Sequence, residues 1–462
     1  MRQVIAILLL FTVLISPPAA APVSPTSSKE SKSPSPLVWK ETENKVSASV
    51  DDWKLDRLMK EIAKVSKWQV FVEPGSDITV SVKFQDQTVR EALSRMLQGI
   101  NYAVVREPDS TTKLLIFKTK AQNAIRAIKP ITEEELAAEI TRIGNELIVS
   151  VKPGTDINSI AARYGAKVVG AIPELGLYRL RFDDQEKADF AKTQLANFPE
   201  VKAVEYNYTI ARPDSPVVAG TSSSLPFSLN PTAASGGNGL VIGLVDTAVQ
   251  PLSGNMNDFL LKAIYAAGAP DLKAGLLHGT SMADTILRAM SAASEGGSST
   301  TKILPVDVFG ANANSSTFDL ANGIYLAVKN GATIINMSLG SPTTAGYLET
   351  LIANSSAQGV LFLGAAGNEH TDSATYPAAY NQVIAVSAAN RNGEIASYAN
   401  YGEFVDVVAP GSSIVTYNGK NYVISGTSSA TATASGVASI LKSNKATADQ
   451  IRQKLSQLWP KK

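Results

Sequence analysis

The stretch 239-GLVIGLVD-246 is an apolar run that ends abruptly in a carboxylate. A short run without charge is typical of a strand covered on both faces, as in a parallel sheet between layers of helices. Because a carboxylate at the tip of such a strand is costly to bury without a partner, Asp246 is a candidate functional residue. The alternative is that Asp246 caps the turn that begins at Thr247.

Similar apolar runs alternate with helical patterns through the rest of the chain. A helix is expected after His278, and two more over 319–331 and 347–359. The apolar runs are 302–309, 333–340, 360–367, 383–390 and 405–410. This alternation predicts an α/β fold with a parallel sheet and helices on both faces. In such folds the functional residues lie at the carboxyl ends of the strands.

The chain contains two histidines, His278 and His370. A lone histidine usually has a structural or surface role, and we expect His370 to be an exposed loop residue. His278 differs, because Gly279 leaves room beside the ring and Thr280 can hydrogen-bond the local turn. A general base must be held rigidly and oriented by a carboxylate on its second nitrogen, and Asp246 is the candidate carboxylate.

Two serines compete for the role of nucleophile. The stretch 276-LLHGTSMADTIL-287 contains GTSMA around Ser281, and 424-ISGTSSATATASGVASILKS-443 contains GTSSA around Ser428. Ser281 lies three residues after His278 on the same element, and no apolar strand leads into it. Ser428 starts a helix of small residues, whose N-terminus carries roughly half a positive charge and favours an oxyanion. We therefore predict Ser428 as the nucleophile, although such a helix start taken alone is more often a packing feature.

Asn368 is the candidate donor to that oxyanion. It follows the apolar run 360–367, directly after a glycine. A side-chain amide in this role contributes about 3 kcal/mol to transition-state stabilisation. The alternative is that Asn368 only forms a turn.

Six motifs occur in one order along residues 237–455. They are LVDTA (244–248), HGTSMA (278–283), TIINMSLGSP (333–342), LFLGAAGNE (361–369), VDVVAPGSSI (405–414) and SGTSSATATASGVA (425–438). In this order they resemble the motifs of the subtilisin-type serine protease family. The resemblance implies a subtilisin-like parallel sheet and hydrolysis of peptide bonds through an acyl-enzyme.

The resemblance also implies a role for each matching residue. Asp246, His278 and Ser428 match the family's catalytic triad, and Asn368 matches the side-chain donor of its oxyanion hole. Ser338, Leu339 and Gly340 match the strand that pairs with extended substrate. Ala365, Ala366 and Gly367 match a wall of the primary specificity pocket.

Two departures from the family pattern stand out. Ala248 occupies a position where the family usually has glycine, and residues 429–433 read SATAT where the family commonly reads Met-Ala-Thr/Ser-Pro-His. Many relatives bind calcium, but residues 237–462 are poor in carboxylates and show no loop with alternating aspartate ligands. We identify no cofactor and no metal ligand, and calcium binding stays open.

Residues 146–210 predict a small α+β domain. The pattern is a strand (146–154), a helix (156–165), a hairpin (166–182), a helix (184–198) and a strand (201–210). The phrases VSVKPGTDI, VVGAIPELGLYRLRF and FPEVKAVEYN resemble the inhibitor-like propeptides of subtilisin-type proteases. This implies that the chain carries its own intramolecular inhibitor. The Pro-, Ser- and Gly-rich linker 211–236 follows, and we expect a processing site within 206–230.

Residues 45–120 predict another small α+β domain, with the order strand–helix–strand–strand–helix–strand–strand. The first helix places Leu55, Leu58, Met59, Ile62 and Val65 on one face, and the second begins with a capping box of Thr88 and Glu91. The domain resembles the secretin-and-TonB short N-terminal domain; an unrelated α+β domain is the alternative. A connector, 121–145, follows, with capping-box spacing at Thr132 and Glu135.

The first residues predict export. Residues 1–21 have a basic start at Arg2, an apolar stretch over 4–15 and a small-residue exit, as a signal peptide does. An uncleaved anchor is the alternative. Residues 22–44 form a Ser-, Pro- and Lys-rich linker, and no later apolar run reaches about 18 residues. We expect a secreted or periplasmic protein without a transmembrane segment after signal removal.

The composition excludes some kinds of chemistry and gives no support to some classes of binding partner. The chain has no cysteine, which excludes disulfides and cysteine nucleophiles, and its formal net charge of +1 favours no nucleic-acid partner. The expected partners are protein or peptide substrates and the chain's own propeptide. Two functions remain: an exported serine endopeptidase made as a zymogen, or a catalytically impaired subtilase-fold scaffold of the cell envelope.

Overall fold

A computed structural model describes most of the chain. The described residues are 36–72, 78–106, 111–117, 126–128, 138, 141–213, 217–220, 227–233, 239–273, 275–295 and 297–461. The expected signal peptide and the predicted capping box at Thr132 and Glu135 lie outside these ranges. The chain divides near residue 137 into two compact units, and each is described by itself. Within the described ranges, every helix is too short or too polar to span a bilayer.

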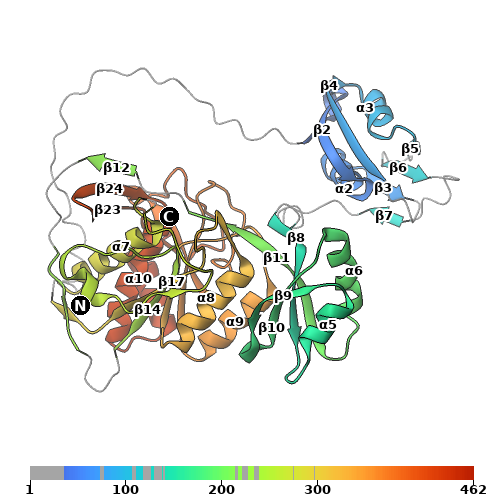
Figure 1. The fold of residues 1–462 in the computed structure, drawn as a ribbon. Helices are drawn as coiled ribbons and strands as arrows, with labels where there is room; N and C mark the ends of the chain where they lie inside the picture. The colour runs from blue at the N-terminus through green and yellow to red at the C-terminus, as the bar shows by residue number, and fades with distance from the viewer. Residues whose placement is uncertain are drawn as a thin grey trace. The chain divides into compact units, whose positions relative to one another are not determined.

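The described part of the first unit contains two small sheets and two α-helices, which can be followed in Figure 1. One sheet has the order β1 (Leu37–Lys40), β2 (Lys45–Lys54), β4 (Thr79–Gln87), and the other has β5 (Asn101–Arg106), β6 (Thr112–Phe117), β3 (Gln69–Val72), β7 (Arg126–Ile128). The helices are α2 (Leu55–Ser66) and α3 (Val89–Met96). The expected order of elements is present, with β1 and β7 added at the ends.

The predicted capping box and the predicted buried helix face in this unit are confirmed. Thr88 accepts a hydrogen bond from the Glu91 backbone, and the Glu91 side chain accepts one from Thr88, so the capping box forms. The predicted face of α2 is buried except for Val65, which is half-buried against the same core. The unit therefore has its own hydrophobic core.

The second unit is built on a seven-stranded parallel sheet (Figure 1). Its order is β15 (Ile264–Tyr265), β17 (Lys302–Asp307), β14 (Val241–Asp246), β19 (Ile334–Met337), β20 (Leu361–Ala365), β21 (Val383–Ala389), β22 (Val407–Pro410). Strand β14, which holds the opening stretch, pairs on both sides. The predicted α/β fold with a parallel sheet is confirmed.

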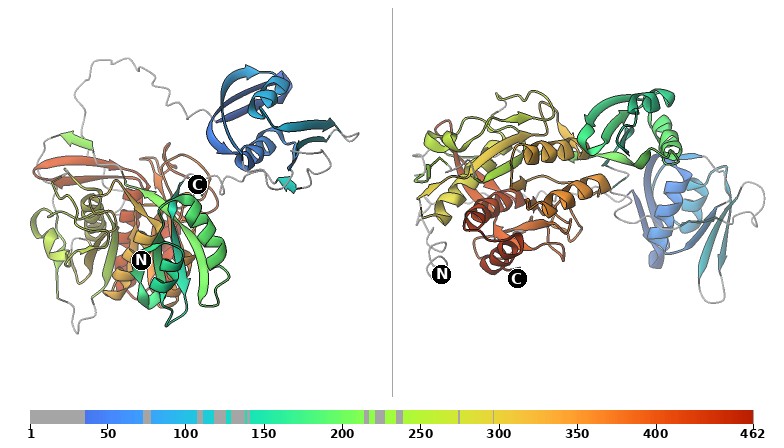
Figure 2. Two further views of the ribbon diagram at one scale, coloured as in Figure 1. Left: turned by 45° about the vertical axis from the view of Figure 1, so that its right-hand side comes forward. Right: turned by 90° about the horizontal axis from the view of Figure 1, so that it is seen from below.

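Helices cover both faces of this sheet (Figure 2). Ile242 and Leu244 pack with α7 (His278–Ala293), α10 (Thr427–Ser443) and α11 (Ala448–Leu458). Val245, which points to the opposite face, packs with α8 (Thr317–Lys329) and α9 (Gly346–Ala357). Because successive side chains of a strand alternate between faces, a strand that is apolar at every position can pack against the helices on both faces of the sheet.

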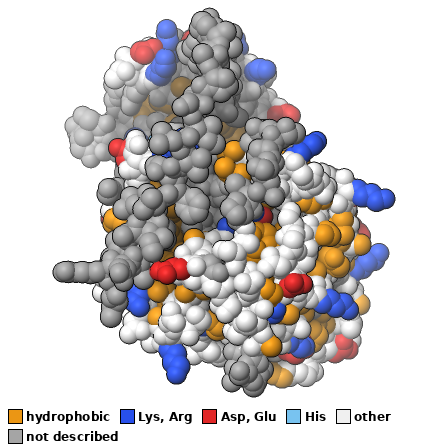
Figure 3. Space-filling model, turned by 90° about the vertical axis from the view of Figure 1, so that its left-hand side faces the viewer, with side chains coloured by type: hydrophobic (Ala, Val, Ile, Leu, Met, Phe, Trp, Pro, Cys, Tyr) orange, Lys and Arg blue, Asp and Glu red, His pale blue; other side chains and the backbone are white. Residues whose placement is uncertain are grey.

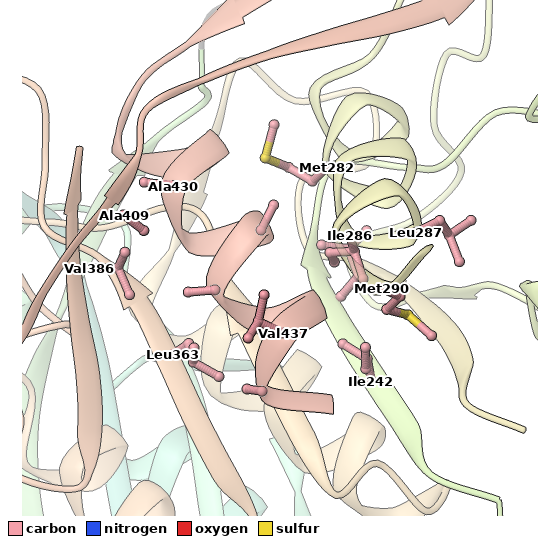
Figure 4. Packing of buried hydrophobic residues seen from close by; sticks show 14 of the residues in the cluster. Ile242, Met282, Ile286, Leu287, Met290, Leu363, Val386, Ala409, Ala430 and Val437 are labelled. Atoms are coloured by element: carbon pink, nitrogen blue, oxygen red, sulfur yellow. The ribbon is translucent and has the colours of Figure 1, made fainter. Parts of the chain in front are cut away.

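Small residues let α10 lie close to α7 (Figure 4). A Cβ added at Gly436 would lie 2.6 Å from the Ile286 carbonyl oxygen and 2.7 Å from the Ala289 Cβ. A side chain at this point would force the two helices apart. The Ala-, Ser- and Gly-rich sequence of α10 thus has a packing role in addition to carrying Ser428.

Residues 142–211 form a five-stranded antiparallel sheet with two helices, and one of its strands comes from elsewhere. The order is β18 (Asn314–Ser316), β11 (Val201–Ala211), β8 (Arg142–Val151), β10 (Leu177–Arg181), β9 (Lys167–Ile172). The helices are α5 (Ile157–Arg163) and α6 (Gln185–Leu195). We call residues 146–210 the second module and residues 237–462 the main region. Through β18, the main region adds a strand to the second module.

Side chains of the second module also cap two helices of the main region. The Glu205 carboxylate accepts hydrogen bonds from the backbone N–H groups of Gly346 (2.7 Å) and Tyr347 (3.1 Å), at the start of α9. Asn207 Oδ1 accepts from the Thr317 hydroxyl and the Phe318 N–H, both at 3.1 Å, at the start of α8. The first turn of a helix has N–H groups without partners in the helix, so both contacts stabilise helix ends.

A half-buried arginine, Arg179, joins the second module to the main region. The Arg179 guanidinium donates to Glu146 of the second module at 2.7 Å and, across the boundary of the module, to Asp319 of α8 at 3.3 Å. Burial opposes ionisation of Glu146, but hydrogen bonds from Arg179 and Asn207 outweigh it and lower the pKa of Glu146. The Arg179–Glu146 pair, which lies within the second module, therefore stays charged at neutral pH, and the second contact of Arg179, to Asp319, ties the module to α8.

Three short strands form a separate small sheet. Strands β23 (Ser412–Tyr417) and β24 (Lys420–Ser425) make a hairpin, and β12 (Val217–Gly220) pairs antiparallel with the other edge of β24. In addition, β13 (Asn230–Pro231) pairs with β16 (Ser298–Ser299). Both β12 and β13 belong to the segment that was predicted from sequence to be a linker.

We predict that Glu205→Ala frees the first turn of α9. The substitution removes the acceptor of two N–H groups, and loss of a helix cap typically costs about 1 kcal/mol. Hydrogen exchange at the Gly346 and Tyr347 amides should speed up about fivefold. Glu174→Ala is the matched control, because the contacts of Glu174 are at an exposed site, among them an ion pair with Lys329 (2.7 Å), and such contacts contribute little. Equal exchange in both variants would contradict the capping role.

Candidate active site

The site lies where several parallel strands end. Asp246 is the last residue of β14, Asn368 follows β20, and Ser338 follows β19. His278 is the first residue of α7, and Ser428 is the second residue of α10. All the candidates thus sit at the carboxyl edge of the sheet, as the α/β pattern predicts.

Asp246 and His278 form a buried pair. The His278 Nδ1 lies 2.8 Å from Asp246 Oδ1 and 3.0 Å from Oδ2, and the two side chains are 6% and 0% exposed. Asp246 Oδ1 also accepts the Thr247 N–H at 2.6 Å. Since a carboxylate can only accept, Nδ1 carries the proton and Nε2 is the nitrogen with a free lone pair. That is the arrangement of a general base.

A tight backbone contact positions His278. The Gly279 N–H donates to the Thr247 hydroxyl at 2.8 Å, and a Cβ at Gly279 would overlap the Thr247 carbonyl oxygen. Gly279 thus does more than leave room beside the ring, because it lets the start of α7 touch the residue after Asp246. This contact between Gly279 and Thr247 fixes the distance between Asp246 and His278.

Gln250 completes this support, and sequence reasoning missed it. Its Oε1 accepts from the Leu277 N–H (2.9 Å) and the Thr280 hydroxyl (3.1 Å), and its own N–H donates to Thr280 Oγ1 (2.8 Å). Gln250 is 2% exposed. The loop after β14 and the start of α7 therefore share one hydrogen-bond network around His278.

Ser428 and Ser281 have different surroundings. Ser428 is partly exposed, and its hydroxyl donates to the Ser338 carbonyl oxygen at 3.1 Å. No hydrogen bond joins Ser428 to His278, both of which are described. Ser281 is 0% exposed, and its hydroxyl bonds the Leu277 carbonyl of its own helix. This placement supports Ser428 over Ser281 as the nucleophile.

Asn368 is oriented by the residue before Ser428. The Asn368 Oδ1 accepts from the Thr427 N–H at 2.9 Å and from the Thr427 hydroxyl at 3.1 Å. The same hydroxyl accepts the Gly367 N–H at 3.1 Å. Because Oδ1 is engaged, the Nδ2 group of Asn368 is left to donate. Thr427 is 0% exposed and was not predicted as a site residue.

A second amide, Asn400, holds the loop that carries Asn368. Asn400 Nδ2 donates to the Ala366 carbonyl (2.9 Å) and to Glu369 (3.1 Å), while its Oδ1 accepts the Glu369 N–H (2.9 Å). Gly367 has φ +107° and lies against Asn400, where a side chain would overlap. The loop therefore requires both the left-handed conformation and the missing side chain of glycine.

The predicted substrate-binding residues are buried or half-buried. Leu339 (5% exposed) packs into the core on the α8–α9 face, and Ala366 (0%) packs with Val405 and Val408, so both can meet a ligand only through their backbone. Ala365 is also buried, whereas Gly340 and Gly367 are half-buried.

The Ser338 side chain supports Ser428 rather than facing solvent. Its hydroxyl donates to the Ser428 carbonyl at 3.1 Å and accepts from Asn336 Nδ2 at 3.0 Å. Asn336 in turn accepts from Ser435 at 2.9 Å. These hydrogen bonds form a buried chain that joins β19 to α10. The sequence did not predict it.

A second carboxylate lies beside Asp246. Asp307 is the register partner of Asp246 across β14 and β17, and it is 1% exposed. Its Oδ1 accepts the N–H groups of Phe309 and Gly310. Burial raises the pKa of Asp307, and the charge of Asp246 adds to this effect. Sequence reasoning did not single out Asp307.

The side chain of the remaining histidine, His370, takes no part in the hydrogen bonds described above. His370 is exposed and lies beside Tyr401, and Asp372 is exposed as well. The predicted loop position of His370 is confirmed.

Among the described residues no group of three or more His, Asp or Glu side chains is arranged to hold a metal ion.

We predict that Gly279→Ala destabilises the protein and separates the Asp246–His278 pair. The added methyl group would overlap a backbone oxygen that cannot move without shifting β14 or α7, which typically costs about 1–3 kcal/mol. Thermal unfolding should show a lowered Tm. Gly297→Ala is the control, because it is exposed and its nearest neighbour to a new Cβ, the Ser294 carbonyl oxygen, lies 3.3 Å away. A wild-type Tm for Gly279→Ala would disprove the contact.

Comparisons with known proteins agree with this geometry. Residues 237–458 match the subtilase family, and residues 134–207 match the fervidolysin N-terminal prodomain. The chain is 30% identical over 327 residues to a thermostable alkaline protease of Halalkalibacterium halodurans, covering 68% of this chain and 86% of that protein. It is 33% identical over 211 residues to subtilisin Savinase of Lederbergia lenta, covering 45% of this chain and 77% of that protein.

A solved structure shares the fold. Fervidolysin from Fervidobacterium pennivorans, described as a keratinolytic enzyme related to subtilisin, superposes with a TM-score of 0.52 at 18% identity. The match covers 68% of this chain and 57% of fervidolysin. With the relatives above, this fold and these ordered motifs lead to one conclusion: the chain belongs to the subtilase family and is a subtilisin-like serine endopeptidase with a fervidolysin-like prodomain.

Proposed function

We propose that the chain is the zymogen of an exported endopeptidase in which Asp246, His278 and Ser428 form the catalytic triad. The observation that carries the proposal is the buried Asp246–His278 pair, which leaves Nε2 of His278 as the proton acceptor. Ser428 lies at the start of a helix on the same edge of the sheet. A scaffold protein would have no physical need for a fully buried carboxylate–imidazole pair of this kind.

In the proposed reaction the Ser428 hydroxyl turns from the Ser338 carbonyl to His278 Nε2 when substrate binds. His278 takes the proton, and the serine oxygen attacks the peptide carbonyl. The oxyanion that forms is stabilised by Asn368 Nδ2 and by the N-terminus of α10. His278 then protonates the leaving amine, and water releases the acyl group by the same route in reverse.

The second module acts as the intramolecular inhibitor in this proposal. It adds β11 to β18 of the main region and caps α8 and α9 through Asn207 and Glu205. Cleavage within 206–230 would release it. Residues 45–120 remain a proposed secretin-and-TonB-type domain, supported by their sequence pattern. Such a domain would place the enzyme in the periplasm or on the outer surface of a cell envelope.

The proposed partners are peptide or protein substrates and the chain's own propeptide. On the face shown in Figure 3, basic and acidic side chains are scattered singly among neutral ones. Among the described residues on that face, no extended patch of one sign is visible that would favour nucleic acid. Secretion is supported by the sequence of residues 1–21, and mass spectrometry of the mature N-terminus tests it together with processing.

We predict that Ser428→Ala abolishes activity and that Ser281→Ala retains most of it. Loss of the nucleophile in such a triad lowers kcat by roughly 10⁶-fold. Casein hydrolysis and labelling by a fluorophosphonate probe measure both variants, and Ser281→Ala is the internal control because its hydroxyl bonds only within α7. Labelling that survives Ser428→Ala and disappears in Ser281→Ala would reverse the assignment. Full-length protein that neither hydrolyses casein nor labels would favour the scaffold alternative.

We also predict that Thr427→Val lowers kcat by about tenfold with little change in KM for a short substrate. The methyl group replaces the hydroxyl that holds Asn368 Oδ1 and the Gly367 N–H, so the oxyanion donor loses its orientation. Thr431→Val is the matched control, one turn later in α10, where the hydroxyl bonds only the Thr427 carbonyl. Equal kcat losses in the two variants would show that helix stability, not Asn368, is responsible.

A further inference from the structure

The edge of β24 leads directly to the proposed nucleophile. Strand β24 ends at Ser425, and two residues separate it from Ser428. On one side β24 pairs with β23, and on the other it pairs antiparallel with β12, where Val217 lies opposite Val423 and Val218 opposite Tyr422 (Figure 1). Strand β12 comes from the segment in which we expect the processing site. A segment of the chain itself is therefore paired with the strand that leads to Ser428.

The preceding strand of the same chain is held at a different place. Strand β11 ends at Ala211, opposite Asn314 of β18, and the Arg212 guanidinium then donates to the carbonyl oxygens of Gly310 (2.8 Å) and Asn312 (2.7 Å). A processing cut ahead of Val217 would therefore leave β11 on the acyl side of the bond and β12 on the leaving-group side. The two strands occupy two separate edges of the main region.

The β23–β24 hairpin has the properties of a peptide-binding strand pair. Val415 and Ile424 face the core (1% and 6% exposed), whereas the cross-strand partners Ile414 and Val423 are 45% and 41% exposed. A strand that pairs with an exposed edge gains backbone hydrogen bonds whatever its sequence, and neighbouring apolar side chains add contact area. The occupant seen here is Val217–Gly220.

We propose that the edge of β24 is a strand-addition site for the peptide chain on the leaving-group side of the bond being cut, and that Val217–Gly220 occupies it as a strap. This inference rests on the proposed role of Ser428. The strap stays with the mature enzyme after processing and must be displaced by any substrate that extends several residues past the cut bond. Short substrates do not meet it.

The test compares a long and a short substrate in the mature enzyme. In the full chain, the sequence Val217-Val218-Ala219-Gly220 is replaced by Gly-Ser-Gly-Ser, which keeps the length and weakens strand pairing. The long substrate is a quenched fluorescent peptide with six residues after the cut bond, and the short one is a peptidyl p-nitroanilide with none. The replacement should lower KM for the long substrate by about tenfold, equivalent to one or two backbone hydrogen bonds. KM for the p-nitroanilide should not change.

Single prolines provide a second set of variants. Successive N–H groups of a strand point to opposite sides, so of Val217→Pro and Val218→Pro only one removes a hydrogen bond to β24. That variant should reproduce the fall in KM for the long substrate, and the other should resemble the wild type. A synthetic peptide, Ser-Pro-Val-Val-Ala-Gly-Thr-Ser, should inhibit the Gly-Ser-Gly-Ser variant against the long substrate alone, and Val423→Lys should weaken that inhibition more than Ile414→Lys.

The possible outcomes distinguish a failure of the strap proposal from a failure of the proposed catalytic function. If wild-type protein hydrolyses the p-nitroanilide and KM for the long substrate is the same in every variant, the strap is disproved and the triad stands. A mature N-terminus after Gly220 would also disprove it. If neither substrate is hydrolysed by wild-type protein, the proposed function itself fails.

Discussion

A carboxylate with no exposed surface has to find its hydrogen-bond donors inside the protein, and Asp246 imposes this requirement on everything around it. The strand that carries it pairs on both sides and is covered on both faces. Its donors are the Thr247 N–H and the His278 ring. An ionised group in such a place is stable only while both donors remain fixed. The start of α7 is therefore tied to the end of β14 by the contact that orients the His278 ring.

The sequence was most informative where the required chemistry is local. An apolar strand ending in Asp246, a glycine after His278 and a small-residue helix after Ser428 each indicate their role over a few residues. The parallel sheet followed from the same continuously apolar runs. The comparisons confirm the family and the fold that these motifs implied.

The supporting residues were not predictable in this way, because their role depends on contacts between distant segments. Thr427 matters through Asn368, 59 residues earlier, and Gln250 through Leu277, 27 residues later. Threonine and glutamine are common in loops, so nothing in the local sequence distinguishes them. Leu339 and Ala366 belong to matching motifs, and the structure adds that their side chains pack into the core, which leaves their backbone to meet a ligand.

The second module and the main region share a sheet, and the proposed cleavage would expose one edge of it in the main region. Departure of β11 uncovers the backbone N–H and C=O groups of β18, a strand of three residues. Exposed strand edges are sites where proteins aggregate, and natural proteins limit the hazard by keeping such edges short. A strand of three residues, such as β18, presents only a short edge of this kind.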